Sequence, residues 1–213
     1  MIFNDFFGVQ LKGKMISKFD TGSIRNRSVA CSSDAEWCGV ASFMSSVPLF
    51  RMVRTGGHGG DDLGNANVKV IKAGSLTGFH KKAIIDLAFG TGAAGVKKLI
   101  TASEDRTWAL WQLPASDAAA SSAAPKRLSG GTIADGHTLT CVALSPDARL
   151  MVAGTLKGAL IFINLEDGAI VDAVPEAHAG HAVTKVVCVP GLPGFVSLAA
   201  GATYASAWRF PTV

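Results

Sequence analysis

The same order of short apolar segments occurs three times in this sequence, and this feature limits the possible folds more than any other. The three units begin at His80, His137 and His181, which are 57 and 44 residues apart. In the first unit the histidine is followed by AIIDLAFG, then LITASED, then WALWQL. Short runs of this kind, rich in Val, Ile, Leu and Trp and bounded by turn residues, indicate β-strands.

The repeat predicts an all-β chain built as a β-propeller, because a period of about 40 to 45 residues with several strands per unit is typical of propeller blades. The 24 glycines and 8 prolines separate further candidate strands along the rest of the chain. We expect about three complete four-stranded blades and two partial ones, in an open ring. The predicted units are the end of a blade at 1–22, blades at 23–80, 81–136 and 137–180, and a partial last blade at 181–213.

Two irregularities affect this division. The 57-residue spacing is explained by residues 114–131, PASDAAASSAAPKRLSGG, which we interpret as an expanded loop between two strands. The pattern also indicates that the chain begins in the middle of a unit. We therefore expect a fragment of a longer propeller, with closure of a small ring by the N-terminal strands as the alternative.

The composition is that of a chain that buries a core, with 48% hydrophobic and 17% charged residues. The net charge of +4 is modest and requires no polyanionic partner. No apolar run approaches the roughly 18 to 20 residues of a membrane helix. The four cysteines fall within strand-like runs, so we interpret them, including Cys31 and Cys38, as core residues of a protein in the reducing cytoplasm.

The segment from His80 through LITASEDRTWALWQL resembles the WD-repeat family. The opening pair Phe79-His80 and the closing pair Trp111-Gln112 differ from the family's Gly-His and Trp-Asp, but their spacing is similar. The resemblance implies a buried hydrogen-bonded tetrad with a structural role, formed by His80, Thr101, Asp105 and Trp111. In such a tetrad the threonine hydroxyl can bridge the imidazole and the indole N–H, and the aspartate can accept from backbone N–H groups and from the imidazole.

The other units do not retain the tetrad in the sequence. Lys157 and Ile163 occupy the aspartate and tryptophan positions of the third unit, and Ala202 occupies the aspartate position of the last. We expect His181 to open the last unit and His178 to be exposed on the connecting loop.

These observations predict a non-catalytic scaffold that binds other proteins, with no cofactor and no metal. Within the WD-repeat family the order of features is most similar to the transducin beta-like proteins, which implies protein partners and a place at the cytosolic face of the endoplasmic reticulum in stress signalling. An excess of basic side chains suits an acidic protein surface or, as an alternative, RNA. The candidate partner-binding residues are Arg25, Arg27, Arg51, Arg54, Lys81, Lys82, Lys97 and Lys98.

A different class of function is suggested by Gly90, Gly92 and Gly95. They form GxGxxG directly after a predicted strand, and Asp117 follows at about the distance that a dinucleotide site requires. This alternative would make the chain an oxidoreductase, and it needs a helix over residues 96–106. Against it, the sister units repeat as strands here, and the chain offers no other helix to cover a parallel sheet.

Overall fold

The computed structural model describes residues 20–22, 25–55, 67–115, 124–133, 137–189 and 193–211, which fold into four antiparallel sheets. We call them blades 1 to 4 in chain order. Blade 1 contains β1 (Asn26–Cys31), β2 (Trp37–Ser42), β3 (Val47–Thr55) and β4 (Asn67–Leu76). Blade 2 contains β5 (Ile84–Thr91), β6 (Lys97–Ser103), β7 (Thr107–Gln112) and β8 (Lys126–Thr132). Blade 3 contains β9 (Leu139–Leu144), β10 (Leu150–Thr155), β11 (Leu160–Asn164) and β12 (Ile170–Val174), and blade 4 contains β13 (Val183–Cys188), β14 (Gly194–Ala199) and β15 (Ser206–Arg209).

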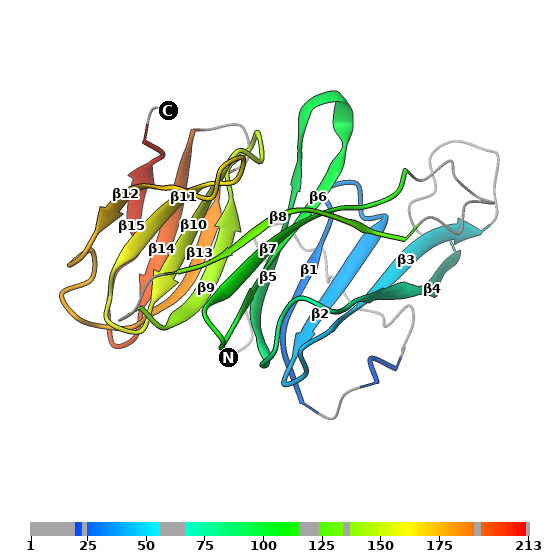
Figure 1. Cartoon of the computed structure of the whole chain (residues 1–213), viewed down its shortest axis with the longest axis horizontal. Coiled ribbons are helices and arrows are strands. Elements are labelled where there is room, and N and C mark those ends of the chain that lie inside the picture. Colours follow the sequence, from blue (N-terminus) through cyan, green and yellow to red (C-terminus); the bar gives the residue numbers. More distant parts are fainter. Residues whose placement is uncertain are drawn as a thin grey trace, which may run out of the picture.

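The blades follow one another in an open arc, with blade 1 at one end and blade 4 at the other (Figure 1). The first strand of each blade packs against the first strand of the next, so β1, β5, β9 and β13 form the inner side of the arc. Within a blade the strands pair in chain order as a simple meander. The predicted all-β, WD-repeat-type propeller with an open ring is confirmed.

Three apolar layers of the core lie between neighbouring blades, and a fourth, smaller cluster lies on the outward face of blade 1. Leu99 and Trp111 of blade 2 face blade 1, whereas Ile100 and Leu110 face blade 3. Successive side chains of a strand point to opposite faces, so a blade that is covered on both sides needs apolar residues at every position. This is why β10 is buried along its whole length and is apolar in the sequence up to its last residue, Thr155.

The turn between the first and second strands has the same chemistry in blades 1 and 3. Ser32 Oγ donates to the Asp34 carboxylate at 2.5 Å, and Ser145 Oγ donates to that of Asp147 at the same distance. The serine oxygen then accepts the backbone N–H of the residue that begins the next strand. In three blades an alanine of this turn has positive φ: Ala35 (57°), Ala94 (55°) and Ala148 (53°). The repeated turn shows the blades to be copies of one unit.

Part of the predicted loop at 114–131 is instead a strand. Residues 126–132 form β8, which pairs with β7 from Thr107↔Thr132 to Gln112↔Lys126. Its side chains are mostly exposed, so β8 has no apolar alternation for a sequence pattern to detect. Gly130 allows a close approach to β7, because a Cβ there would lie 2.9 Å from the carbonyl oxygen of Trp108. Backbone pairing with β7 therefore defines this strand, although its sequence has no strand-like apolar pattern.

The ends of the predicted propeller are only partly visible. Nearly all of the predicted partial blade at 1–22 lies outside the described residues, of which only 20–22 belong to it. At the other end, the described part of blade 4 has three strands, and β15 is its outer edge. Among the described residues, no helix has the length and apolarity that crossing a membrane requires.

Candidate interaction surfaces

The structure brings the four residues of the expected tetrad together in blade 2. Thr101 Oγ1 lies 2.8 Å from His80 Nε2 and accepts the indole N–H of Trp111 at 3.0 Å. The nearest approach of His80 Nδ1 to Asp105 Oδ1 is 4.0 Å, and Thr107 stands between them. His80 Nδ1 lies 2.6 Å from Thr107 Oγ1, and the same hydroxyl donates to the Asp105 carboxylate. Thr107, which the sequence reasoning missed, is therefore the fifth member of the cluster.

These contacts define one direction of proton donation. The single hydroxyl proton of Thr101 goes to the nearer acceptor, the imidazole at 2.8 Å, instead of the Ala109 carbonyl at 3.3 Å. The chain of donors then runs from the Trp111 indole through Thr101 to His80 Nε2, and from His80 Nδ1–H through Thr107 to Asp105. Burial lowers the pKa of His80 to about 4, so the imidazole is neutral. A neutral ring with both nitrogens satisfied is a structural link between strands.

Asp105 ends the chain of donors as a carboxylate. Burial raises its pKa, but hydrogen bonds from Thr107 and from the backbone N–H of Lys81 outweigh that effect and bring the pKa to about 2. The Lys81 N–H lies 2.5 Å from Asp105 Oδ2, so the carboxylate also holds the segment that enters blade 2.

The last blade retains a partial cluster, and here the expectation about its histidines was wrong. His178 is 5% exposed and its Nε2 lies 2.7 Å from Ser197 Oγ, which also accepts the indole N–H of Trp208 at 2.7 Å. His181 is exposed on the connecting segment. The two histidines therefore exchange the roles expected from the sequence, and the backbone N–H of His178 also donates to Gly158 O of blade 3 at 3.0 Å. In blade 3, Ile163 is buried in the apolar layer.

Most of the candidate basic residues have partners within the chain. Arg27 forms an ion pair with Glu104 of blade 2 at 2.7 Å and lies over the Phe43 ring at 4.1 Å, and Arg25 lies over the same ring. Arg51 lies over Trp37. The side chain of Arg54 lies outside the described residues. Lys81 and Lys82 are exposed beside the tetrad, and in the described part of the chain neither side chain forms an ion pair.

Lys97 and Lys98 connect blade 2 to both of its neighbours. Lys97 Nζ lies 2.5 Å from the Asp34 carboxylate of blade 1, and Lys98 Nζ donates to Ala148 O of blade 3 at 3.3 Å. Adjacent residues of a strand point to opposite faces, so two consecutive lysines can reach opposite neighbours. Their position at the start of β6 makes them links between blades.

Asp86 joins the inner strands of all four blades. Its side chain, on β5, accepts from Ser28 Oγ of β1 at 2.6 Å and from the backbone N–H of Val142 of β9 at 3.1 Å. Lys185 Nζ of β13 lies 3.1 Å from each carboxylate oxygen. Asp86 is 2% exposed, whereas the Lys185 side chain is 43% exposed. A buried carboxylate with three donors is a stable arrangement, and this one spans the inner side of the arc.

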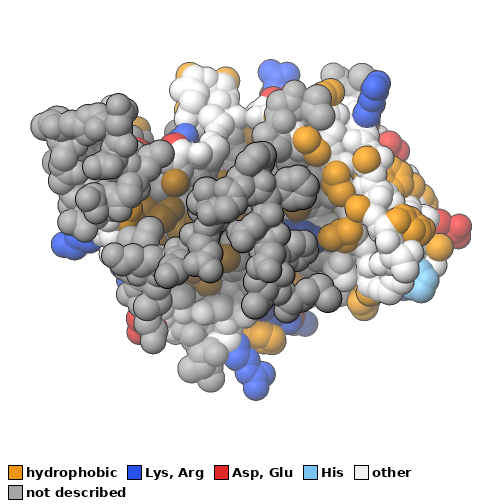
Figure 2. Space-filling model, turned by 180° about the vertical axis from the view of Figure 1, so that it is seen from behind, with side chains coloured by type: hydrophobic (Ala, Val, Ile, Leu, Met, Phe, Trp, Pro, Cys, Tyr) orange, Lys and Arg blue, Asp and Glu red, His pale blue; other side chains and the backbone are white. Residues whose placement is uncertain are grey.

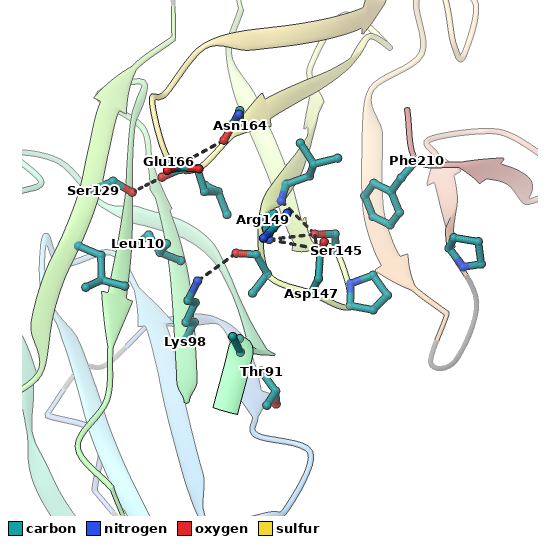
Figure 3. Close-up of a pocket in the computed structure, with 18 of the residues that line it drawn as sticks. Thr91, Lys98, Leu110, Ser129, Ser145, Asp147, Arg149, Asn164, Glu166 and Phe210 are labelled. Carbon is teal, nitrogen blue, oxygen red and sulfur yellow. Dashed lines mark hydrogen bonds between the residues drawn. The ribbon is translucent and has the colours of Figure 1, made fainter. Parts of the chain in front are cut away.

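A groove of about 1400 Å³ crosses three blades at the end where the first and second strands are joined. Leu110 and Ser129 of blade 2 lie on one side of the Ser145–Arg149 turn, and Phe210, after β15, lies on the other side (Figure 3). Leu128 of blade 2 also lines the groove. Ser129 Oγ donates to Leu165 O at 2.7 Å and ties β8 to blade 3. Burial raises the pKa of Asp147 in this turn, but the bonds from Ser145 and from the Arg149 N–H lower it below its usual value. The groove thus combines apolar walls with charged residues.

The three glycines of the GxGxxG alternative lie in the hairpin between β5 and β6. These strands are antiparallel, and β6 begins two residues after Gly95, where a dinucleotide motif requires a helix. A Cβ on Gly90 would lie 2.9 Å from Leu144 of blade 3, and Gly95 has φ +75° in the turn. Packing and turn geometry therefore account for both glycines.

The four meander sheets and the tetrad define the class of fold, a β-propeller of WD-repeat type. Among solved structures, the chain is similar to the β-propeller domain of Cps50 (Swd1) from Myceliophteria thermophila, with a TM-score of 0.63 and 10% sequence identity. The similarity covers 87% of this chain and 54% of that one, so this chain spans about half the length of its neighbour. At this identity the likeness shows the fold alone. No protein-family model and no curated protein matches the chain.

Proposed function

We propose that this chain is a non-catalytic scaffold that binds a segment of another protein in the groove that crosses blades 2, 3 and 4 at the end where their first and second strands are joined. The groove is the observation that carries the proposal. Its volume of about 1400 Å³ exceeds that of typical small-molecule sites. Leu128 on its wall is 42% exposed, and apolar side chains exposed in a concave surface favour protein binding.

The polar clusters support a structural role over a catalytic one. His80 and His178 each have a ring nitrogen against a buried hydroxyl that also accepts a tryptophan indole. Asp86 is saturated by donors from three other strands. In the described residues these groups hold strands together, and none of them points into the groove.

From the sequence resemblance to transducin beta-like protein 2, we further propose that the chain lies in the cytoplasm, at the cytosolic face of the endoplasmic reticulum. On the same ground we propose that its partners act in stress signalling. Fractionation of cells that express the tagged chain tests this part. We expect the chain to sediment with endoplasmic-reticulum membranes and to be released by high salt, and recovery in the cytosolic fraction alone would contradict it.

The groove is tested with a matched pair of variants, Leu128→Glu inside it and Leu156→Glu outside it. Leu156 is 55% exposed in the turn between β10 and β11, at the opposite end of the strands, and does not line the groove. The tagged wild type and both variants are cross-linked in cell extract, and the bound proteins are identified by mass spectrometry. We expect one set of proteins to be captured by the wild type and by Leu156→Glu and to be lost with Leu128→Glu. Equal capture by all three folded chains would refute the groove as the binding site.

A salt titration of the captured complex distinguishes a protein from RNA as the partner. The logarithm of the binding constant for a polyanion falls steeply with the logarithm of salt concentration, because counterions are released. We expect a shallow slope, since Arg27 and Lys97 already have acidic partners within the chain. A slope of several units, abolished by Lys81→Ala with Lys82→Ala, would instead support the RNA alternative.

A further inference from the structure

Cys31 and Cys38 face each other on the neighbouring strands β1 and β2, where their Cα atoms are register partners. The adjacent pair, Ser32 and Trp37, is joined by a backbone hydrogen bond from Ser32 N–H to Trp37 O of 2.9 Å. Hydrogen-bonded and non-hydrogen-bonded pairs alternate along antiparallel strands, so Cys31 and Cys38 form a non-hydrogen-bonded pair. The Cα atoms of such a pair are about 4.5 Å apart. That distance lies within the range of about 4.4 to 6.8 Å that disulfides span.

The two thiols share a face of the sheet but differ in exposure. Cys31 is exposed, contrary to the expectation that it belongs to the core, because blade 1 is at one end of the arc and its outward face lacks a neighbouring blade among the described residues. Cys38 is 4% exposed and packs with Val40 and Phe50. Burial raises the pKa of Cys38 to about 12, and the neighbouring Cys31 contributes to the increase. Cys31 is therefore the thiol that a dissolved oxidant meets first.

We propose that Cys31 and Cys38 are a redox-active pair that closes into a disulfide across β1 and β2 on reaction with a small disulfide oxidant such as oxidised glutathione. The Cys31 thiolate attacks one sulfur of the oxidant, its S–S bond breaks, and one glutathione thiolate leaves. The Cys38 thiolate then attacks the Cys31 sulfur of this mixed disulfide, and the second glutathione thiolate leaves. The two protein thiols lose two electrons to the oxidant, and their two protons go to the two glutathione thiolates.

Closure of this bond would fasten the innermost strand of blade 1 to its neighbour. β1 carries Ser28, which donates to Asp86, so the bond acts on a strand that takes part in the contact among all four blades. A crosslink that fits the native register stabilises a fold by restricting the unfolded chain. We therefore expect oxidation to raise the thermal unfolding midpoint of the chain. This inference does not depend on the scaffold role.

The experiment treats the folded full chain with oxidised glutathione, blocks the remaining thiols with an alkylating reagent, and maps the peptides by mass spectrometry without reduction. We expect a linked pair of peptides that contain Cys31 and Cys38, with neither residue alkylated. Cys38→Ala should stop the reaction at a persistent glutathione adduct on Cys31. Cys31→Ser should leave Cys38 reduced, since it is buried.

Cys188 provides the matched control, because it also lies on a first strand but faces Phe195 instead of a second thiol. Cys188→Ala should leave the yield of the crosslink unchanged. Recovery of Cys31 and Cys38 as separately alkylated peptides, or a stable glutathione adduct on Cys31 of the wild-type chain, would overturn the proposal. So would a crosslink that forms faster in urea than in the folded chain, because the native register would then not promote it.

Discussion

At the scale of single residues, His80 shows how burial and hydrogen bonding act together. Its ring lies between the hydroxyls of Thr101 and Thr107, and the Thr107 hydroxyl donates a hydrogen bond to Asp105. In the folded protein this imidazole is neutral, whereas in the unfolded chain it can be protonated. The stability of blade 2 therefore depends on pH between the pKa of His80 in the folded state and its pKa in the unfolded state.

We predict that the stability conferred by His80 is lost as the pH falls from about 6.5 to about 4. The pKa is lowered from the ordinary 6.5 to about 4, so within this window the unfolded state takes up a proton that the folded state does not. The contribution of His80 to the free energy of unfolding is complete above pH 6.5, and roughly 3 kcal/mol of it is lost at pH 4. Urea unfolding of the wild type and of His80→Gln at a series of pH values measures it. Parallel pH profiles for the two chains would contradict the prediction.

We also predict that Thr107→Val lowers the free energy of unfolding by about 1–3 kcal/mol at pH 7. The change keeps the shape of the side chain but leaves the buried His80 Nδ1–H and one Asp105 oxygen without the bridging hydroxyl. Thr132→Val, at an exposed position of β8, is the control and should change stability by less than about 0.5 kcal/mol. Equal effects of the two substitutions in denaturant titrations would show that the bridge is dispensable.

At the scale of strands, the outer edges of blades 1 and 3 are protected from pairing with another chain in different ways. Lys69 and Lys72 lie on the edge strand β4, and charged side chains on an edge oppose pairing with another chain. On β12, a register shift opposite Phe162 and Ile163 leaves Val171 unpaired. The Asp172 carboxylate accepts the backbone N–H of Ala173 at 2.8 Å, so this donor is not offered to a second molecule.

We predict that Asp172→Ala makes the chain self-associate. Ile170 and Val171 are exposed apolar side chains on the same edge, and hydrophobic side chains gather over blades 3 and 4 in Figure 2. Without the carboxylate, the Ala173 N–H and these side chains form an open edge of the kind that promotes strand pairing. Light scattering as a function of protein concentration measures the effect. Glu176→Ala removes an equal charge from the following turn and should remain as dispersed as the wild type.

At the scale of the whole molecule, the blades are coupled through Asp86 as well as through apolar layers. Its partners lie 56, 58 and 99 residues away in the sequence. The exposed Lys185 contributes little to the coupling between the blades, because solvent screens its charge. The hydrogen bond from the Val142 backbone is buried and the one from Ser28 is partly buried, so we expect these two bonds to carry most of the coupling.

We predict that Asp86→Ala lowers the free energy of unfolding by about 3 kcal/mol and separates the unfolding of the blades. Asp86→Asn should be milder, because its amide oxygen still accepts one of the buried donors. Hydrogen exchange followed by mass spectrometry measures the opening of each blade through its own peptides. Uniform protection across blades 1 to 4 in Asp86→Ala would show that the apolar layers alone couple them.

The sequence by itself determined the features that depend on short stretches of chain. Most of the strands and their repetition follow from short apolar runs bounded by turn residues, so a local pattern contains them. The positions of His80, Thr101, Asp105 and Trp111 came from the resemblance of one such unit to the WD-repeat family. Strand β8 lacked such a pattern and was missed. Thr107 was missed because a threonine at the start of a strand has no distinctive signal.

Only the tertiary structure decided what depends on the packing of one blade against another. In the tertiary structure His178, and not His181, bonds to Ser197 in the last blade. Lys97 and Lys98 contact opposite neighbouring blades, and Asp86 contacts three other strands. The tertiary structure also left the outward face of blade 1, which carries Cys31, without a neighbouring blade among the described residues. Each of these contacts joins residues whose separation in space is set by sheet register and by the order of the blades. Neither quantity is encoded in the residues next to them in the chain.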